Sequence, residues 1–278
     1  MSTKSVNTNV SAAIALQNLT RTNQRLDDVQ GRISTGLKVQ GAKDNASIWA
    51  IAQAQRAELG ALNAVKQSLA RATSLADVAL SAGDSISDLL NQLKEKVVAA
   101  QDVSLSTQSR ELYNDDFQAL LRAIESAVEN AEFDGGNLLN GSISIGIAFL
   151  ANADATAFIT LSAKDLTLSG PIISLSTADS LATTTGAAQA LTRLNDSITA
   201  VNSALGEIGA KAKQIAAHSN FVVKLTDTLE AGIGNLVDAD MAKESARLQA
   251  LQVQQQLGVQ ALSIANQGPQ ILLSLFQR

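Results

Sequence analysis

The stretch DMAKESARLQALQVQQQLGVQALSIAN, residues 240–266, places apolar side chains on two opposite faces of one predicted helix. At 100° per residue, the first stripe consists of Leu248, Leu251 and Leu262, and the second stripe consists of Ala246, Val253, Leu257 and Ile264. Five glutamines lie between these stripes: Gln249, Gln252, Gln254, Gln256 and Gln260. A surface helix needs only one apolar face, so a helix with two requires a partner on each side.

The beginning of the chain carries a matching pattern. Ala12, Leu19, Leu26 and Ile33 recur every seven residues, with Ala15, Leu16 and Val29 beside them. This spacing is typical of one helix packing on another. If the two ends pair, one stripe of the C-terminal helix is covered, and another copy of the chain is the simplest cover for the other. The pattern does not decide which stripe faces which partner.

The two ends therefore predict a polymer subunit whose terminal helices form the self-assembly interface. The candidate interface residues are Leu19, Leu26, Val29, Ile33, Leu248, Leu251, Val253, Leu257, Leu262, Ile264 and Leu275.

Composition favours long helices over an aromatic-rich globular core. The 278 residues are 46% hydrophobic but only 3% aromatic, with two prolines. The net charge of −5 argues against nucleic acid as the partner of the whole chain. We interpret the six basic residues among the first 43 as solvated or inter-subunit charges: Lys4, Arg21, Arg25, Arg32, Lys38 and Lys43.

The sequence lacks the residues that several kinds of catalytic and binding site require. The chain has no cysteine, so disulfides, thiol catalysis and thiolate metal sites are excluded. The single histidine, His218, has no second histidine with which to share a metal, and Gly232-x-Gly234 is followed by Val237 rather than by a third glycine. We expect no catalytic, cofactor or metal site, no membrane-spanning segment and no cleaved secretory leader.

The periodicity predicts a mainly α-helical chain with a small β region in the middle. Predicted helices cover residues 5–36, about 46–100, 105–130, 178–233 and 240–266, with ends expected at Gly36, at Gly232 to Gly234 and at Gly268-Pro269. Predicted strands cover residues 143–149, 157–162 and 166–168. Asp44 and Asn45 are candidate caps of the second helix, and turns are expected at residues 133–136 and at Asn140-Gly141.

Three groups of motifs together resemble bacterial flagellins. Near the N-terminus these are Asn7-Thr-Asn9, Arg32-Ile-Ser-Thr-Gly-Leu-Lys38 and Ala42-Lys-Asp-Asn45. The turn Phe133-Asp-Gly-Gly-Asn-Leu-Leu-Asn-Gly141 resembles the point where the flagellin middle begins. At the C-terminus, Asp238-Ala-Asp-Met-Ala-Lys-Glu-Ser245 and residues 251–276 resemble the flagellin end. The segment Ser47-Ile48-Trp49 resembles the short flagellins of alphaproteobacteria.

The resemblance implies a long antiparallel helical bundle or coiled coil, formed by pairing the N- and C-terminal parts, with only the two inner flagellin domains. Residues 1–43 and 236–278 would form a discontinuous inner domain. Residues 44–235 would form an outer helical domain, with a β hairpin at about 140–170. Its implied function is polymerisation into the extracellular flagellar filament for swimming motility, after export without a cleaved leader.

The resemblance also implies partners and two further kinds of site. The partners would be other copies of the chain, an export chaperone and export gate, the filament cap and the hook-associated junction proteins. Gln254 and Gln256 are candidates to line the filament channel, where uncharged polar side chains would not trap a passing chain electrostatically. Candidate O-glycosylation sites in two Ser- and Thr-rich segments are Thr167, Ser169, Ser176 and Thr177.

Three other functions compete with a filament subunit. A hook–filament junction protein shares flagellin-like ends, but the continuous match at both ends favours the filament. A flagellin-like cell-surface binding protein would need an exposed aromatic or charged patch, and the middle offers only Phe149 and Phe158 as aromatic residues. An enzyme is disfavoured by the missing catalytic residues.

Overall fold

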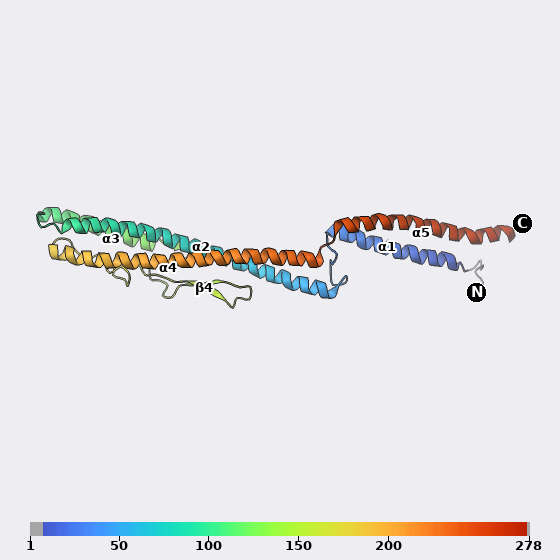
Figure 1. Ribbon diagram of the computed structural model, residues 1–278, viewed down its shortest axis with the longest axis horizontal. Helices are drawn as coiled ribbons and strands as arrows, with labels where there is room; N and C mark the ends of the chain where they lie inside the picture. Colours follow the sequence, from blue (N-terminus) through green and yellow to red (C-terminus); the bar gives the residue numbers. More distant parts are fainter. Residues whose placement is uncertain (1–7, 277–278) are drawn as a thin grey trace. The chain divides into compact units, whose positions relative to one another are not determined.

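The protein is mainly α-helical with two small β hairpins, which confirms the predicted fold class. The computed structural model describes the backbone of residues 8–276 and the side chains of residues 8–267. The elements in chain order are α1 (Val10–Thr35), α2 (Ala46–Ala100), α3 (Thr107–Glu129), β1 (Glu132–Phe133), β2 (Gly136–Asn137), β3 (Ile147–Leu150), β4 (Phe158–Leu161), α4 (Thr184–Val237) and α5 (Met241–Phe276) (Figure 1). None of these described helices combines the length and the apolar character needed to cross a membrane.

The chain forms two compact units. The terminal unit comprises Met1–Ala57 and Thr228–Arg278, and the central unit comprises Glu58–Asp227. The terminal unit contains α1, α5 and one end each of α2 and α4, whereas the central unit contains the rest of those two long helices together with α3 and both hairpins.

The central unit is built on one continuous buried stripe of α2. Positions alternate by three and four residues, and every one is at most 3% exposed: Leu62, Val65, Leu69, Ala72, Ala76, Ala79, Ile86, Leu90, Leu93, Val97 and Ala100. Gly83 occupies the one place in this series without a side chain, and a Cβ built there would lie 2.1 Å from Leu205 Cδ2 of α4. Such a 3–4 spacing is the pattern of helices packed nearly parallel along their length.

Two helices begin or end next to residues that the sequence predicts for this role. The Asn45 carboxamide accepts a hydrogen bond from the Ile48 backbone N–H at 3.0 Å and so caps α2. Gly36, at φ 74°, ends α1 in the left-handed conformation that favours glycine. Asp44 has a different role from the predicted one, because its Oδ2 accepts from the backbone N–H groups of Gln40 and Gly41 in the preceding loop.

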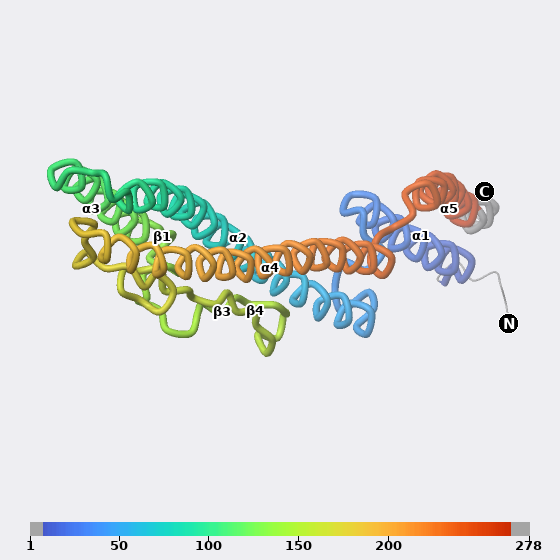
Figure 2. The backbone as a smooth tube through the Cα atoms, turned by 60° about the vertical axis from the view of Figure 1, so that its left-hand side comes forward, coloured from blue at the N-terminus to red at the C-terminus, as the bar shows by residue number. Residues whose placement is uncertain are grey.

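The two hairpins lie against the helices of the central unit. Asp134 and Gly135, both with positive φ, form the tight turn between β1 and β2, as the sequence predicts. β3 and β4 pair antiparallel, and in Figure 2 this hairpin runs alongside α4. His218 Nε2 of α4 lies 2.7 Å from the backbone oxygen of Ala151, just beyond β3. This hydrogen bond joins the hairpin to α4.

The predicted strands are only partly correct. The alternation of residues 143–149 begins to pair only at Ile147, because the partner strand ends opposite it at Leu161. Ile145 is consequently 83% exposed. Residues 166–168 do not form a strand, since the backbone N–H of Leu166 donates instead to Leu139 and Leu168 makes only an isolated bridge.

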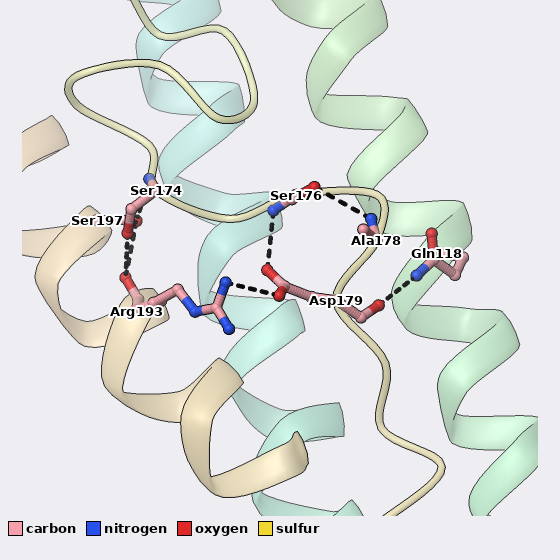
Figure 3. A network of polar contacts seen from close by, with 7 residues as sticks. All are labelled: Gln118, Ser174, Ser176, Ala178, Asp179, Arg193 and Ser197. Atoms are coloured by element: carbon pink, nitrogen blue, oxygen red, sulfur yellow. Dashed lines mark hydrogen bonds and ion pairs between the residues drawn. The ribbon is translucent and has the colours of Figure 1, made fainter.

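The start of α4 lies six residues later than predicted, because polar contacts hold the preceding loop (Figure 3). The Asp179 carboxylate accepts from the Ser176 backbone N–H at 2.9 Å and pairs with Arg193 of α4 at 2.8 Å. Gln118 of α3 donates to the Asp179 backbone oxygen at 2.6 Å. These bonds fix a turn at residues 176–179 and hold it to α3 and α4, so the helix begins only after it.

Two predicted helix ends are also wrong. α4 continues through Gly232 and Gly234 to Val237, and α5 continues past Gly268-Pro269 to Phe276. A glycine inside a helix costs only about 1 kcal/mol, so two of them do not stop a helix of 54 residues. A proline inside a helix removes one backbone hydrogen bond, and the helix can continue beyond it with a kink.

Candidate self-assembly surface on the terminal helices

α1 and α5 pair antiparallel along their length, side by side in Figure 1. Asn9 Nδ2 donates to the backbone oxygen of Ala265 at 2.8 Å. Nearer the middle, Gln255 Nε2 donates to Asn23 Oδ1 at 2.9 Å. At the other end the ion pair between Arg32 and Glu244 spans 3.7 Å. The predicted pairing of the two chain ends is therefore present within one copy.

The first stripe of α5 faces α1. Positions spaced four and three residues apart form the covered side of α5, each of them buried or half-buried: Glu244, Leu248, Leu251, Gln255, Gly258, Leu262 and Ala265. Gly258 gives room to Leu19, whose Cδ1 would lie 3.2 Å from a Cβ built at the glycine. The structure thus resolves the ambiguity of the two stripes, and Leu248, Leu251 and Leu262 face the partner within the same chain.

The predicted residues of α1 lie on the side that faces α5. Leu26 and Val29 are 7% and 6% exposed, whereas Leu19 and Ile33 are half-buried. Leu16, predicted alongside them, is 54% exposed and belongs to another face of the helix.

The second stripe of α5 is open to solvent in the single copy. Val253, Leu257 and Ile264 are 55%, 59% and 65% exposed. Val259, which belongs to neither stripe, is 54% exposed on the same helix. The side chain of Leu275 lies outside the described residues.

Backbone hydrogen bonds join the residues that follow α1 to the residues that precede α5. Leu37 and Asp238 form an antiparallel bridge. The Lys38 N–H donates to the Val237 backbone oxygen at 2.7 Å, and the Ala239 N–H donates to the Gly36 backbone oxygen at 2.8 Å. These bonds fix the register in which α1 and α5 meet.

A buried carboxylate at this end of the pair was not predicted. Glu244 is 5% exposed, and its Oε1 lies 2.7 Å from Arg247 Nη1 and 3.7 Å from Arg32 Nη1. Its other oxygen, Oε2, is buried and has no hydrogen-bond partner among the described residues. The spacing Glu244-x-x-Arg247 was the only sequence signal available, because the third member comes from the other end of the chain.

The remaining predicted sites occupy different environments. Gln254 and Gln256 are both exposed on α5. Ser169 and Thr177 are exposed, whereas Thr167 and Ser176 are half-buried. Thr167 Oγ1 donates to Asp165 at 2.6 Å, and Ser176 Oγ accepts from the Ala178 N–H at 3.1 Å.

The surface that these residues form suits protein contacts. It combines an apolar stripe, uncharged glutamines and a few arginines, which is the kind of surface that other proteins cover. Within the described part of the chain, no group of three or more His, Asp or Glu side chains is placed to hold a metal ion.

The comparison with known proteins agrees with this geometry. The family model for the bacterial flagellin N-terminal helical region matches residues 6–144, and that for the C-terminal helical region matches residues 191–276. The chain is 51% identical over 275 residues to flagellin FljJ of Caulobacter vibrioides, with 98% of each chain covered.

The chain belongs to the bacterial flagellin family. It is also similar to the flagellin of Brucella melitensis, at 39% identity over 281 residues, which cover 98% of this chain and 99% of that one. Among solved structures, a putative flagellar hook-associated protein from Vibrio parahaemolyticus has a TM-score of 0.58 at 14% identity, covering 70% of this chain and 100% of that one. That likeness concerns the fold alone.

This flagellin is therefore a structural subunit that polymerises into the extracellular flagellar filament for motility, as the sequence predicts. Full-length identity to flagellins does not favour the junction protein or the cell-surface binding protein, the two alternatives within the same architecture.

Proposed function

We propose that the second stripe of α5 is the main surface through which one copy of this flagellin contacts its neighbours in the filament. The observation that supports this proposal is the exposure of Val253, Leu257 and Ile264, each more than half exposed, on a helix whose opposite face is already covered by α1. A neighbouring copy removes these side chains from water, and the first stripe stays with α1.

Burial of the second stripe contributes favourably to assembly. Full burial of one such side chain contributes about 1.5–3 kcal/mol, so covering the exposed halves of three contributes roughly 3 kcal/mol per contact. Each subunit in the filament makes this contact with its neighbours, and its contribution adds to those of the other contacts between copies.

The same geometry couples order in the terminal helices to polymerisation. Outside the α1–α5 contact, a single copy leaves one side of α5 uncovered, and a two-helix pair with one covered face has little stability of its own. Neighbours that bind only the ordered form stabilise it by mass action. Residues 1–43 and 236–278 act here as the inner assembly domain, with residues 44–235 outside it.

Gln256 lines the channel of the filament in this proposal. Its side chain is exposed, polar and uncharged, so it hydrates the wall without holding an unfolded chain by charge. Gln254, predicted with it, is also exposed but borders the groove between α1 and α5. Export through that channel involves a chaperone and the export gate, and growth involves the filament cap and the hook-associated junction proteins. Filament growth unchanged by Gln256→Lys would count against the channel assignment.

Ser169 and Thr177 are the better O-glycosylation candidates of the four predicted hydroxyls. Both are exposed, whereas the hydroxyls of Thr167 and Ser176 are half-buried and hydrogen-bonded. Peptide mass spectrometry of native filaments tests this choice. An unmodified mass for the peptides that contain Ser169 and Thr177 removes it.

The direct test of the assembly surface compares the full chain with a chain that lacks residues 238–278. Purified protein is seeded with salt and imaged by electron microscopy. Filaments from the full chain alone support a flagellin whose α5 drives assembly. Filaments from both proteins would contradict the role of α5, and a clean monomer from both would contradict self-polymerisation of this chain.

A further inference from the structure

Two grooves of opposite charge lie beside each other in the terminal unit. The basic groove runs between α1 and α5 and carries Arg25, Arg32 and Arg247 above the apolar side chains of Val29 and Leu251. The acidic groove lies between α1 and the loop that follows it, and it carries Asp27, Asp28 and Asp44. Asp28 and Arg32 border both grooves.

The basic groove is not neutralised within one copy. Arg32 and Arg247 share the single carboxylate of Glu244, both through Oε1. Arg25 is exposed and makes no ion pair among the described residues, although Asp28 lies in the same groove. Three guanidinium groups therefore face two carboxylates, and the buried Glu244 Oε2 still lacks a donor. The charges around this groove are therefore not fully paired within one copy.

The acidic groove has the complementary excess. Asp44 is held in place because its Oδ2 accepts from two backbone N–H groups, those of Gln40 and Gly41. Asp27 is exposed and makes no ion pair among the described residues. Three carboxylates therefore face one guanidinium group, that of Arg32.

We propose that the basic groove of one copy receives the acidic groove of a second copy, with Arg25 contacting the Asp27 carboxylate of that copy. This inference rests on the proposed function, since it names a contact within the polymer. Guanidinium and carboxylate groups form paired, directional hydrogen bonds, which fix orientation as well as attraction. The two grooves are different surfaces of one chain, so their contact is head-to-tail, and such contacts build open polymers.

The charged contact complements the apolar second stripe of α5. Apolar burial is non-directional and tolerates sliding of one helix along another. Opposite charges suppress misplaced encounters and raise the association rate, and added salt weakens both effects. The grooves thus select the position at which the second stripe is buried.

A charge swap tests this contact in the full chain. Arg25→Glu and Asp27→Arg are made singly and together, and seeded elongation of each protein on seeds of its own kind is followed by light scattering and electron microscopy. Each single variant should elongate at least about tenfold more slowly than the natural chain, because it sets like charges against each other. The double variant should recover to within roughly threefold of the natural rate, because the pair is restored in reverse.

The double variant has the same net charge as the natural chain, so its recovery cannot come from total charge. Single variants that elongate at the natural rate overturn the inference, and so does a double variant slower than both single ones. If a single variant loses helix content by circular dichroism, Arg25→Gln and Asp27→Asn replace the reversals, and the expected loss falls to about threefold.

Two further outcomes are distinguishable. Inorganic phosphate that accelerates elongation of the natural chain, but not of the Arg25→Glu variant, would mean that a free anion fills the basic groove, and this overturns the contact between copies. Failure of the natural chain to polymerise at all would contradict the proposed function instead. Filaments from the natural chain with unaffected single variants would overturn only this inference.

Discussion

The central unit and the terminal unit bury their helices to very different extents. Along α2 in the central unit, the buried stripe from Leu62 to Ala100 is at most 3% exposed at the positions that form it. In the terminal unit, α1 has only Leu26 and Val29 as buried residues, and Glu244 is the one buried residue in the described part of α5. Both units use the same three-and-four spacing, yet only the central unit has an uninterrupted buried stripe.

This difference indicates a division of labour within one chain. The central unit gains its stability from its own core, because α2, α3 and α4 supply covering surfaces for one another. The terminal unit has one covered face and one open face per helix, so part of its stability comes from other copies. Variants of both units test this contrast.

The largest expected effect is on filament formation. Leu257→Lys places a charge in the second stripe, which a neighbour would have to bury without a partner, so filaments should be lost. Because Leu257 is 59% exposed in the single copy, thermal unfolding of the central unit should not change. Electron microscopy and calorimetry measure the two effects.

Leu257→Met serves as the control, since it retains an apolar side chain of similar size and should still form filaments. Filaments of normal length from Leu257→Lys would contradict the assignment of the second stripe.

The next effect concerns the core of the central unit. Phe117 of α3 is fully buried, so Phe117→Ala should lower the free energy of unfolding by about 3–5 kcal/mol. Leu19→Ala, at a half-buried position of α1, should cost the isolated chain much less. Denaturant unfolding of the two variants compares the units directly, and equal losses would contradict the division between them.

Alanine substitutions at two glycines of α2 should change stability by smaller amounts and in opposite directions. Gly83→Ala brings a Cβ within 2.1 Å of Leu205 Cδ2, so it should destabilise the central unit by about 1–2 kcal/mol. Nothing lies within 4 Å of a Cβ at Gly60, where alanine should stabilise the helix by up to about 1 kcal/mol. Opposite shifts of the unfolding midpoint are expected. Shifts of the same sign would contradict the requirement for a residue without a side chain at Gly83.

The smallest effect is a pH dependence in the loop between α2 and α3. Hydrogen bonding from the Ser104 backbone N–H lowers the pKa of Asp102, so the folded state holds its proton less tightly than the unfolded state. The resulting stability is present above the ordinary aspartate pKa, near 3.9, and is lost as the pH falls through the lowered value. In Asp102→Asn, the free energy of unfolding should therefore fall slightly less steeply as the pH drops below about 4. Denaturant unfolding at a series of pH values measures this slope, and an unchanged slope would contradict the contribution of Asp102.

The sequence predicts the helices well where periodicity decides them. α2 runs from Ala46 to Ala100, as its apolar spacing predicts, and Asn45 and Gly36 bound their helices through local hydrogen bonds or backbone conformation. Such features depend on neighbours in sequence. They are visible without knowledge of the fold.

Long-range contacts account for most of what the sequence could not predict. The start of α4 depends on the Asp179–Arg193 ion pair and on Gln118, which lies 61 residues away from Asp179. The helix end predicted at Gly268-Pro269 is too early, since α5 continues to Phe276.

The sequence predicts the two stripes of the candidate assembly surface but not the partner of each stripe. Both stripes of α5 follow from the spacing of its leucines, but the assignment of Leu251 inward and Leu257 outward required the partner helix. The buried Glu244 joins residues from the two ends of the chain, so no local pattern could identify the ion pair with Arg32.

The backbone bonds between Gly36, Lys38, Val237 and Ala239 have a consequence for the regularity of a long filament. A slip of α1 by one residue against α5 would shift side chains by about 1.5 Å and rotate them by about 100°. In a polymer of thousands of identical parts, such an offset would be repeated at every joint and would accumulate as curvature or as growth arrest. Because this short bridge fixes the register between α1 and α5, every copy presents its assembly surface in the same position.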